Sequence, residues 1–156
     1  MLRLIQTRRF VFTLLWVGFI LAISFLEAPL KFQAESVTIP IGLEIGYLVF
    51  HALNGIEIAF AAILLIISFT CKTPFPTLRL LIIVIGWLLI QTIMLYGPLD
   101  QRTLAIISGE TVPEAPWHLI YIGMEVVKLF LLLRLAHLQM NDFEMSAGHS
   151  AKLKHK

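Results

Sequence analysis

Four long, largely apolar segments constrain the fold of this chain more than any other feature of its sequence. They cover residues 10–26, about 42–70, 80–96 and 117–138. A helix needs about 20 mostly apolar residues to cross the hydrocarbon core of a bilayer. The four segments therefore predict an all-α integral membrane protein, folded as a bundle of four transmembrane helices.

The composition favours a membrane protein and excludes several other classes. The chain is 58% hydrophobic and 14% charged, whereas soluble domains contain about 45–50% apolar and about 25% charged residues. A net charge of +2 does not indicate the clustered basic surface that a nucleic acid would need. Cys71 is the single cysteine, which excludes an intramolecular disulfide and a cysteine-pair redox site.

Polar segments containing proline separate the apolar ones, as expected near helix ends. We expect residues 1–138 to form the membrane domain and residues 139–156 to form a polar cytoplasmic tail. The basic and then apolar N-terminus also fits a secretory signal peptide. However, "SFLEAP" is a poor cleavage site, so we interpret residues 10–26 as an uncleaved first span.

Basic residues predict the direction of the helices, because loops on the cytoplasmic side are enriched in lysine and arginine. Most of them fall before the first segment, in the second loop and near the C-terminus: Arg3, Arg8, Arg9, Lys72, Arg79, Arg134, Lys152, Lys154 and Lys156. The first and third loops contain only Lys31 and Arg102, beside several acidic residues. Both termini are therefore predicted to be cytoplasmic, and both of these loops to face the outside.

Two polar stripes cross the second and fourth segments. Each has the spacing i, i+3, i+7 and i+10, which places four side chains on one helical face. The stripes are Glu44, Tyr47, His51 and Asn54, and His118, Tyr121, Glu125 and Lys128. Their common order and direction indicate two repeated helical hairpins, with chance as the alternative.

The helical rise of about 1.5 Å per residue brings these polar groups together in the outer half of the predicted bundle. Glu27 and Asp100 end the first and third segments on that side, Gln91 adds an amide, and Glu57 follows His51 by about one turn. An ionisable group in hydrocarbon costs at least about 2.5–3.5 kcal/mol. These residues should therefore line an outward-facing pocket or pair with one another, as Glu125 with Lys128 and His51 with Glu125 or Glu57.

Simpler roles compete with a binding site at each position. His51 could fasten two helices by a hydrogen bond, and Glu125 and Lys128 could only neutralise each other. A protonated Glu57 would need no ligand, because burial favours the neutral carboxyl. His118, beside Trp117, is typical of an interfacial anchor, and the two tyrosines of the stripes could be packing residues.

Cofactor motifs give little support to a metal centre. No Glu-x-x-His, His-Glu-x-x-His or multi-histidine pattern occurs, although carboxylate-bridged bundles use such spacings. A mixed site built from His51, Glu44 and Glu125 remains a hypothesis on ligand chemistry alone. A haem held by His51 and His118 is disfavoured, because the two histidines are predicted at different depths. We therefore predict no cofactor beyond that hypothetical metal ion.

Two sequence blocks resemble known proteins. "GFILAISFLEAPLKFQ" and "IGYLVFHALNGIE" resemble uncharacterised small four-span membrane proteins of bacteria. The resemblance covers roughly the first third of the chain. It implies a bacterial inner membrane and transfers no catalytic residue.

Three functional hypotheses follow. The first is binding or transport of a small polar solute, an ion or a lipid headgroup in the outward-facing pocket. The second is a membrane-embedded enzyme that uses a histidine–glutamate pair on a lipid-soluble substrate. The third is an accessory subunit of a larger membrane complex. In each case the lipid bilayer is the surrounding partner, and a homo-oligomer is compatible with all three.

Overall fold

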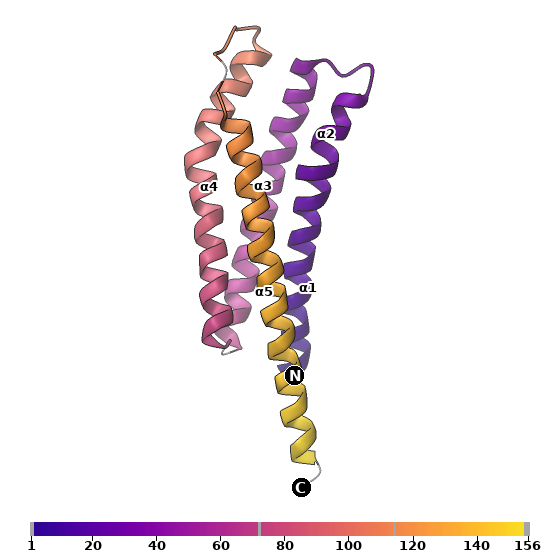
Figure 1. Cartoon of the computed structure of the whole chain (residues 1–156), viewed down its shortest axis with the longest axis vertical. Helices are drawn as coiled ribbons and strands as arrows, with labels where there is room; N and C mark the ends of the chain where they lie inside the picture. The colour runs from indigo at the N-terminus through magenta and orange to yellow at the C-terminus, as the bar shows by residue number, and fades with distance from the viewer. Residues whose placement is uncertain (1, 72, 114, 155–156) are drawn as a thin grey trace.

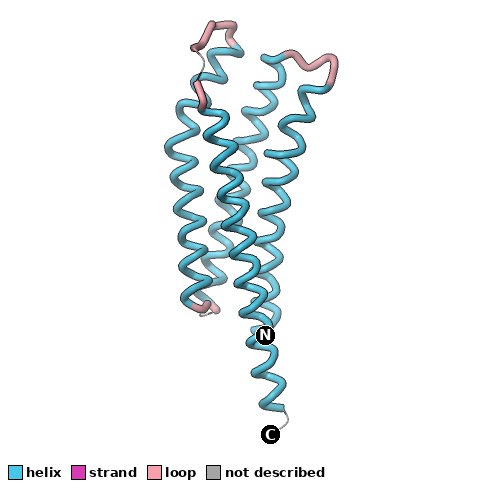
Figure 2. The backbone as a smooth tube through the Cα atoms, viewed as in Figure 1, coloured by secondary structure: helices cyan, strands magenta, loops and turns pink. Residues whose placement is uncertain are grey.

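The structure is a computed structural model that describes the backbone of residues 2–71, 73–113 and 115–154, and every regular element in these residues is helical. Figures 1 and 2 show the helices and the short loops between them. The elements are α1 (Leu2–Ile20), η1 (Leu21–Glu27), α2 (Ala28–Leu30), η2 (Lys31–Gln33), α3 (Ile39–Thr70), α4 (Phe75–Ile107) and α5 (Trp117–Lys154). The all-helical fold is as predicted.

Three helical segments of the described chain are long and apolar enough to cross a membrane. They are Arg9–Gln33, Ile39–Thr70 and Phe75–Ile107. The fourth predicted span lies in α5 and is not among them, because Glu125, Lys128 and Arg134 interrupt its apolar stretch. On length and composition alone, α5 is therefore the least suited of the long helices to a lipid environment.

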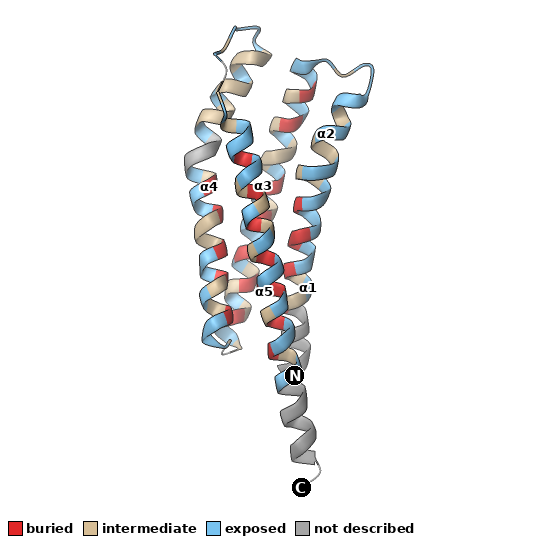
Figure 3. Cartoon of the chain, viewed as in Figure 1, coloured by how far each residue is buried: buried red, intermediate tan, exposed pale blue. Residues whose placement is uncertain are grey.

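The long helices pack side by side in the order α1, α3, α4 and α5, and α5 closes the arrangement against α1. Buried side chains from these helices fill the interior, with Trp16 of α1 stacked on Phe60 of α3. Figure 3 shows buried residues toward the middle of the bundle and exposed residues over its outside. The N- and C-terminal ends of the described chain lie at the same end of the bundle.

The hydrogen-bonding pattern widens in η1, just before Pro29. The backbone N–H of Ala28 donates to the carbonyl of Ile23, five residues earlier. Proline has no N–H to donate, and its ring would clash with the carbonyl four residues back. A wider π-helical turn accommodates the ring, and such turns are frequent at functional sites. The segment that follows folds inward and places Lys31 and Phe32 against α3.

Helix α4 extends further than the sequence pattern indicates. Pro98 lies within it, and the helix continues to Ile107 rather than ending near residue 96. The end is formed by Gly109, whose φ of 86° is in the left-handed region. The N–H of Gly109 donates to Ile106, and that of Glu110 donates to Ala105, which is the Schellman arrangement. The extension brings Leu99, Asp100 and Thr103 alongside α3.

Polar contacts join α1, α4 and α5 at the end of the bundle that holds the termini. Arg9 forms a buried ion pair with Asp142 at 4.0 Å and donates to Thr73, while Thr77 donates to Asp142 at 2.9 Å. Burial raises the pKa of the Asp142 carboxyl, although the hydrogen bond from Thr77 and the charge of Arg9 lower it. Helix α5 thus packs against the bundle as far as Asp142, and its last turns extend beyond the other helices (Figure 1).

Candidate functional site: a polar cavity above a buried charged cluster

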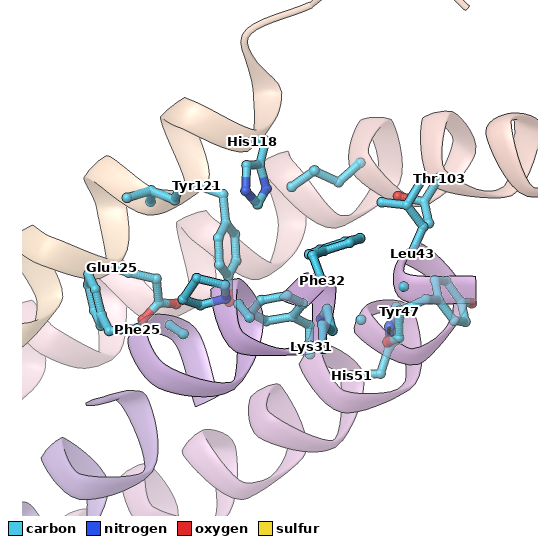
Figure 4. Close-up of a pocket in the computed structure, with 18 of the residues that line it drawn as sticks. Phe25, Lys31, Phe32, Leu43, Tyr47, His51, Thr103, His118, Tyr121 and Glu125 are labelled. Carbon is cyan, nitrogen blue, oxygen red and sulfur yellow. Dashed lines mark hydrogen bonds between the residues drawn. The ribbon is translucent and has the colours of Figure 1, made fainter. Parts of the chain in front are cut away.

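A cavity of about 390 Å³ lies at the end of the bundle opposite the termini. It is enclosed by the segment from η1 to η2, the first half of α3, the last turns of α4 and the first turns of α5. Figure 4 shows its side chains directed inward from these elements. Its size is within the range of small-molecule sites.

Much of the cavity wall is apolar and aromatic. Phe25, Phe32, Leu43, Phe50 and Ile122 supply this surface, and the ring of Phe50 makes an edge contact with Tyr121 at a centroid distance of 5.3 Å. Polar groups are set into this wall at a few points: Lys31, Tyr47, His51, Asp100, His118, Tyr121 and Glu125. An apolar wall with few polar groups is typical of sites for amphipathic ligands.

Two glycines of α3 leave space for side chains that form part of the cavity wall. A Cβ atom at Gly42 would overlap the ring of Phe32, and one at Gly46 would lie 2.9 Å from Nζ of Lys31. The Gly-x-x-x-Gly spacing here admits two side chains from the preceding segment. Glycine at these positions therefore fixes where an aromatic ring and a cation enter the cavity.

Lys31 is held by charge and by aromatic rings. Its Nζ atom lies 3.4 Å from Oε2 of Glu27, one helical turn earlier. It also lies 5.6 Å from the ring centroid of Phe32 and 5.4 Å from that of Phe50. These distances are within the range of cation–π attraction. The positive charge of Lys31 is thus compensated by its immediate surroundings.

His51 and Asp100 form a second close pair at the cavity. Nε2 of His51 lies 3.1 Å from Oδ2 of Asp100, and Nδ1 lies 2.7 Å from the backbone oxygen of Tyr47. Both neighbours are hydrogen-bond acceptors when the carboxyl is ionised, so each ring nitrogen must then carry a proton. Both ring nitrogens of His51 are thus engaged by neighbouring oxygen atoms.

A buried cluster of charged and polar side chains lies deeper in the bundle. Nζ of Lys128 is 2.6 Å from Oε1 of Glu57, 2.9 Å from Oε1 of Glu125 and 3.0 Å from Oε1 of Gln91. An ammonium group has three N–H donors, and all three have acceptors here. Gln91 donates to Oε1 of Glu125 at 2.7 Å, and Trp16 donates to Oε1 of Glu57 at 2.9 Å. We call these five residues the Lys128 cluster.

The Lys128 cluster joins all the long helices, because its members come from α1, α3, α4 and α5. Lys128 and Glu125 are fully buried, and Glu57 is nearly so. Glu125 also lines the cavity, so this residue connects the cluster to the open space. Its Oε2 atom is buried and has no hydrogen-bond partner among the described residues.

The structure gathers most of the residues singled out from the sequence. Lining the cavity are Tyr47, His51, Asp100, His118, Tyr121 and Glu125. Glu57 and Lys128 lie beneath it in the cluster, and Asn54 is buried and donates to Thr92 at 2.8 Å. Glu27 contacts the cavity indirectly through Lys31. Glu44 is exposed and is not among the cavity residues.

Three participants were missed by sequence reasoning. Lys31 and Phe32 follow the first apolar segment, and only the four-residue spacing of Lys31 from Glu27 hinted at a role. Trp16 lies in an apolar run, where an indole N–H bonded to Glu57 has no sequence signal. The expected partner of His51 was Glu125 or Glu57, but its carboxylate partner is Asp100, which α4 reaches only because it continues through Pro98.

A metal centre gains no support from this geometry. Within the described residues, no group of three or more His, Cys, Asp or Glu side chains is arranged to hold a metal ion. The hypothetical ligands His51, Glu44 and Glu125 are not brought together: Glu44 is exposed, and His51 is paired with Asp100.

Comparison with known proteins gives no relative to set beside this site. No family model matches the chain, and neither a curated protein nor a solved structure matches it. Functional inference therefore depends on the geometry and chemistry of the cavity.

Proposed function

We propose that this chain is a multi-pass protein of the bacterial inner membrane that binds or transports a small polar solute, an ion or a lipid headgroup. The cavity is the binding site, and it opens to the outside. The observation that supports this proposal most directly is the buried carboxylate of Glu125, which lines the cavity and leaves its Oε2 atom unpartnered among the described residues.

Membrane insertion is supported by the apolar outside of the bundle. Large hydrophobic side chains are exposed along each long helix, including Leu15, Phe69, Ile93 and Phe130. Soluble monomers rarely expose contiguous apolar surface of this kind. We propose that α5 is the fourth span despite its charges, since Glu125 and Lys128 are buried and paired. The basic residues near the termini favour a cytoplasmic location for both ends.

The two other functional hypotheses are less well supported. An enzyme with His51 as general base would need a ring nitrogen available to the substrate, yet both nitrogens contact acceptors within the protein. An accessory subunit would direct its polar stripes toward a partner, whereas most of these residues converge within the bundle. Binding or transport accounts for the cavity and for the burial of its polar groups together.

Native mass spectrometry of the protein, purified from a bacterial membrane in mild detergent, tests the proposal. We expect a small molecule to be retained by the wild-type protein and lost from the His51→Ala and Glu125→Gln variants. Glu44→Gln is the matched control, because it removes an exposed carboxylate of α3 outside the cavity. Equal retention by all of these variants, or no bound molecule in the wild type, would contradict a binding function.

A further inference from the structure

The chemistry of the cavity identifies a class of ligand, an inference that depends on the proposed binding function. The first observation is the position of Glu125. Its carboxylate is fully buried, and its Oε1 atom accepts hydrogen bonds from Lys128 and Gln91. Its Oε2 atom accepts none from the described residues. Figure 4 shows the side chain projecting from α5 into the region between Phe25 and Lys31.

An unsatisfied buried carboxylate oxygen is unfavourable, since desolvation removes its water contacts without replacing them. A ligand that donates a hydrogen bond to Oε2 satisfies the group in its ionised form. Glu125 is among the residues that line the cavity, so a molecule bound there is the natural source of such a donor.

The second observation is the charge of the Lys128 cluster. Glu57 and Glu125 are two carboxylates, and Lys128 is the only basic side chain that contacts them in the described chain. When both acids are ionised, the cluster has one uncompensated negative charge in a region of low dielectric. Buried charge of this kind is costly unless it is paired. A cation beside Glu125 would remove the imbalance.

The other charges of the cavity are already balanced and do not call for an anion. Lys31 is paired with Glu27 and lies over two aromatic rings. His51 faces Asp100. With Glu57 and Glu125 both ionised, the negative charge of the Lys128 cluster is thus the one that a ligand would compensate.

The third observation is the apolar wall. Phe25 and Phe32 belong to the segment from η1 to η2, and Phe50 lies on α3. Phe32 and Phe50 already hold the ammonium group of Lys31 between them. Aromatic faces attract cations and also bury apolar carbon. The wall suits a cationic head attached to an apolar body.

We propose that the cavity binds an amphipathic cation, a protonated amine on an apolar body, whose N–H group donates a hydrogen bond to Oε2 of Glu125. A free lipophilic amine and the ammonium headgroup of an aminolipid share this chemistry.

Three probes with the same apolar body test the proposal: 4-phenylbutylamine, 4-phenylbutan-1-ol and 4-phenylbutanoate at neutral pH. Binding to the full chain in phosphatidylcholine nanodiscs is measured by calorimetry, with empty nanodiscs to subtract partitioning. We expect the amine to bind at least about tenfold more tightly than the alcohol, which corresponds to about 1.4 kcal/mol. The carboxylate should bind most weakly.

Two variants should change amine binding in opposite directions. Glu125→Gln keeps the Oε1 acceptor for Lys128 and Gln91 and removes the negative charge, so the preference for the amine over the alcohol should disappear. Lys31→Met keeps the apolar stem and removes a like charge, so the affinity for the amine should rise. Glu44→Gln, outside the cavity, should leave all three affinities unchanged. The comparison of probes on the wild type requires no variant to fold.

The possible results separate this inference from the proposed function. Preferred binding of the carboxylate, or weaker amine binding in Lys31→Met, would show an anion site governed by Lys31 and overturn the inference while leaving a binding function. Equal binding of amine and alcohol would overturn it in the same way. Failure of all three probes to bind would contradict both. Competition by added phosphatidylethanolamine would identify a lipid headgroup as the source of the cation, and its absence would identify a free amine.

Discussion

At the scale of single residues, Lys128 supplies the positive charge that compensates the buried carboxyl groups inside the bundle. Each of its N–H donors has an acceptor, and two of those acceptors are carboxylates. Replacing such a cluster by apolar residues of similar volume can be neutral, whereas removing one partner leaves the others buried and unpaired. The cluster is therefore more sensitive to the loss of one member than to the loss of all its charges.

Lys128→Met should lower the free energy of unfolding by about 3–5 kcal/mol, the range for breaking a buried ion pair. The cause is that Glu57 and Glu125 would remain buried close together with no positive charge between them. Chemical unfolding in detergent, followed by circular dichroism, measures the effect. Arg134→Met is the matched control because Arg134 is exposed on the same helix, and it should change stability by less than about 0.5 kcal/mol.

Adding Glu57→Gln and Glu125→Gln to Lys128→Met should recover most of the lost stability, because no buried charge is then left unpaired. A triple variant as unstable as Lys128→Met alone would show that Lys128 acts through packing and not through charge.

Individual site residues differ in whether the sequence could predict their position. The helical spacing brought Tyr47, His51, Tyr121 and Glu125 to the cavity, since residues on one face of an amphipathic helix share their surroundings. Glu44 satisfies the same spacing and is exposed, although its neighbour Leu43 lines the cavity. Pairing between helices, such as His51 with Asp100, depends on where α4 ends, which periodicity does not specify.

At the scale of elements, the first half of α3 is shaped by the segment that precedes it. Phe32 occupies the space next to Gly42 that a Cβ atom would need. Helix propensity alone favours alanine over glycine by about 1 kcal/mol. The benefit of alanine at a glycine of α3 should therefore depend on what lies against that glycine.

Gly55→Ala should raise the melting temperature, because no heavy atom lies within 4 Å of the new Cβ. Gly42→Ala should not, since the ring of Phe32 must move. Combining Gly42→Ala with Phe32→Ala should restore the gain in stability that Gly55→Ala shows, a coupling that a double-mutant cycle measures. Additive effects of the two substitutions would mean that Phe32 does not pack against α3 as described.

The end of α4 was not predicted correctly from the sequence. Pro98 indicated a helix end, but transmembrane helices tolerate proline where neighbouring groups compensate the missing bond. The effective signal was Gly109, eleven residues later, which adopts the left-handed conformation that favours glycine. The wide turn before Pro29 has no sequence signature beyond the proline itself.

At the scale of the whole molecule, the all-helical fold follows from the apolar segments, because their lengths suit membrane-crossing helices. Three of the four qualified by length and composition in the structure. The packing order of the helices could not be predicted from the sequence, since an apolar pattern does not specify which helix packs against which. The proposed topology places the turn between α3 and α4 at the same end as both termini.

Cys71 lies at that turn and is the single cysteine of the chain, so the unmodified protein reports its own topology. A membrane-impermeant maleimide should label it only after the membrane of bacterial spheroplasts is permeabilised. Ser108 is exposed at the opposite end, directly after α4. The variant Cys71→Ser/Ser108→Cys should be labelled in intact spheroplasts. The reverse pattern would invert the proposed orientation, and labelling of both sites in intact spheroplasts would exclude a spanning arrangement.

The position of Lys128 in the last long helix has a consequence for biogenesis. A ribosome completes α1, α3 and α4 before α5. In the proposed membrane arrangement, Trp16, Glu57 and Gln91 would therefore enter the membrane before their ammonium partner has been synthesised. During that interval Glu57 would be neutral or would remain near water. On this proposal, α5 would then supply the missing positive charge, and the acceptors on the earlier helices would already be in place to bind Lys128. Translation order would thus make the last helix the step that commits the nascent chain to its final packing.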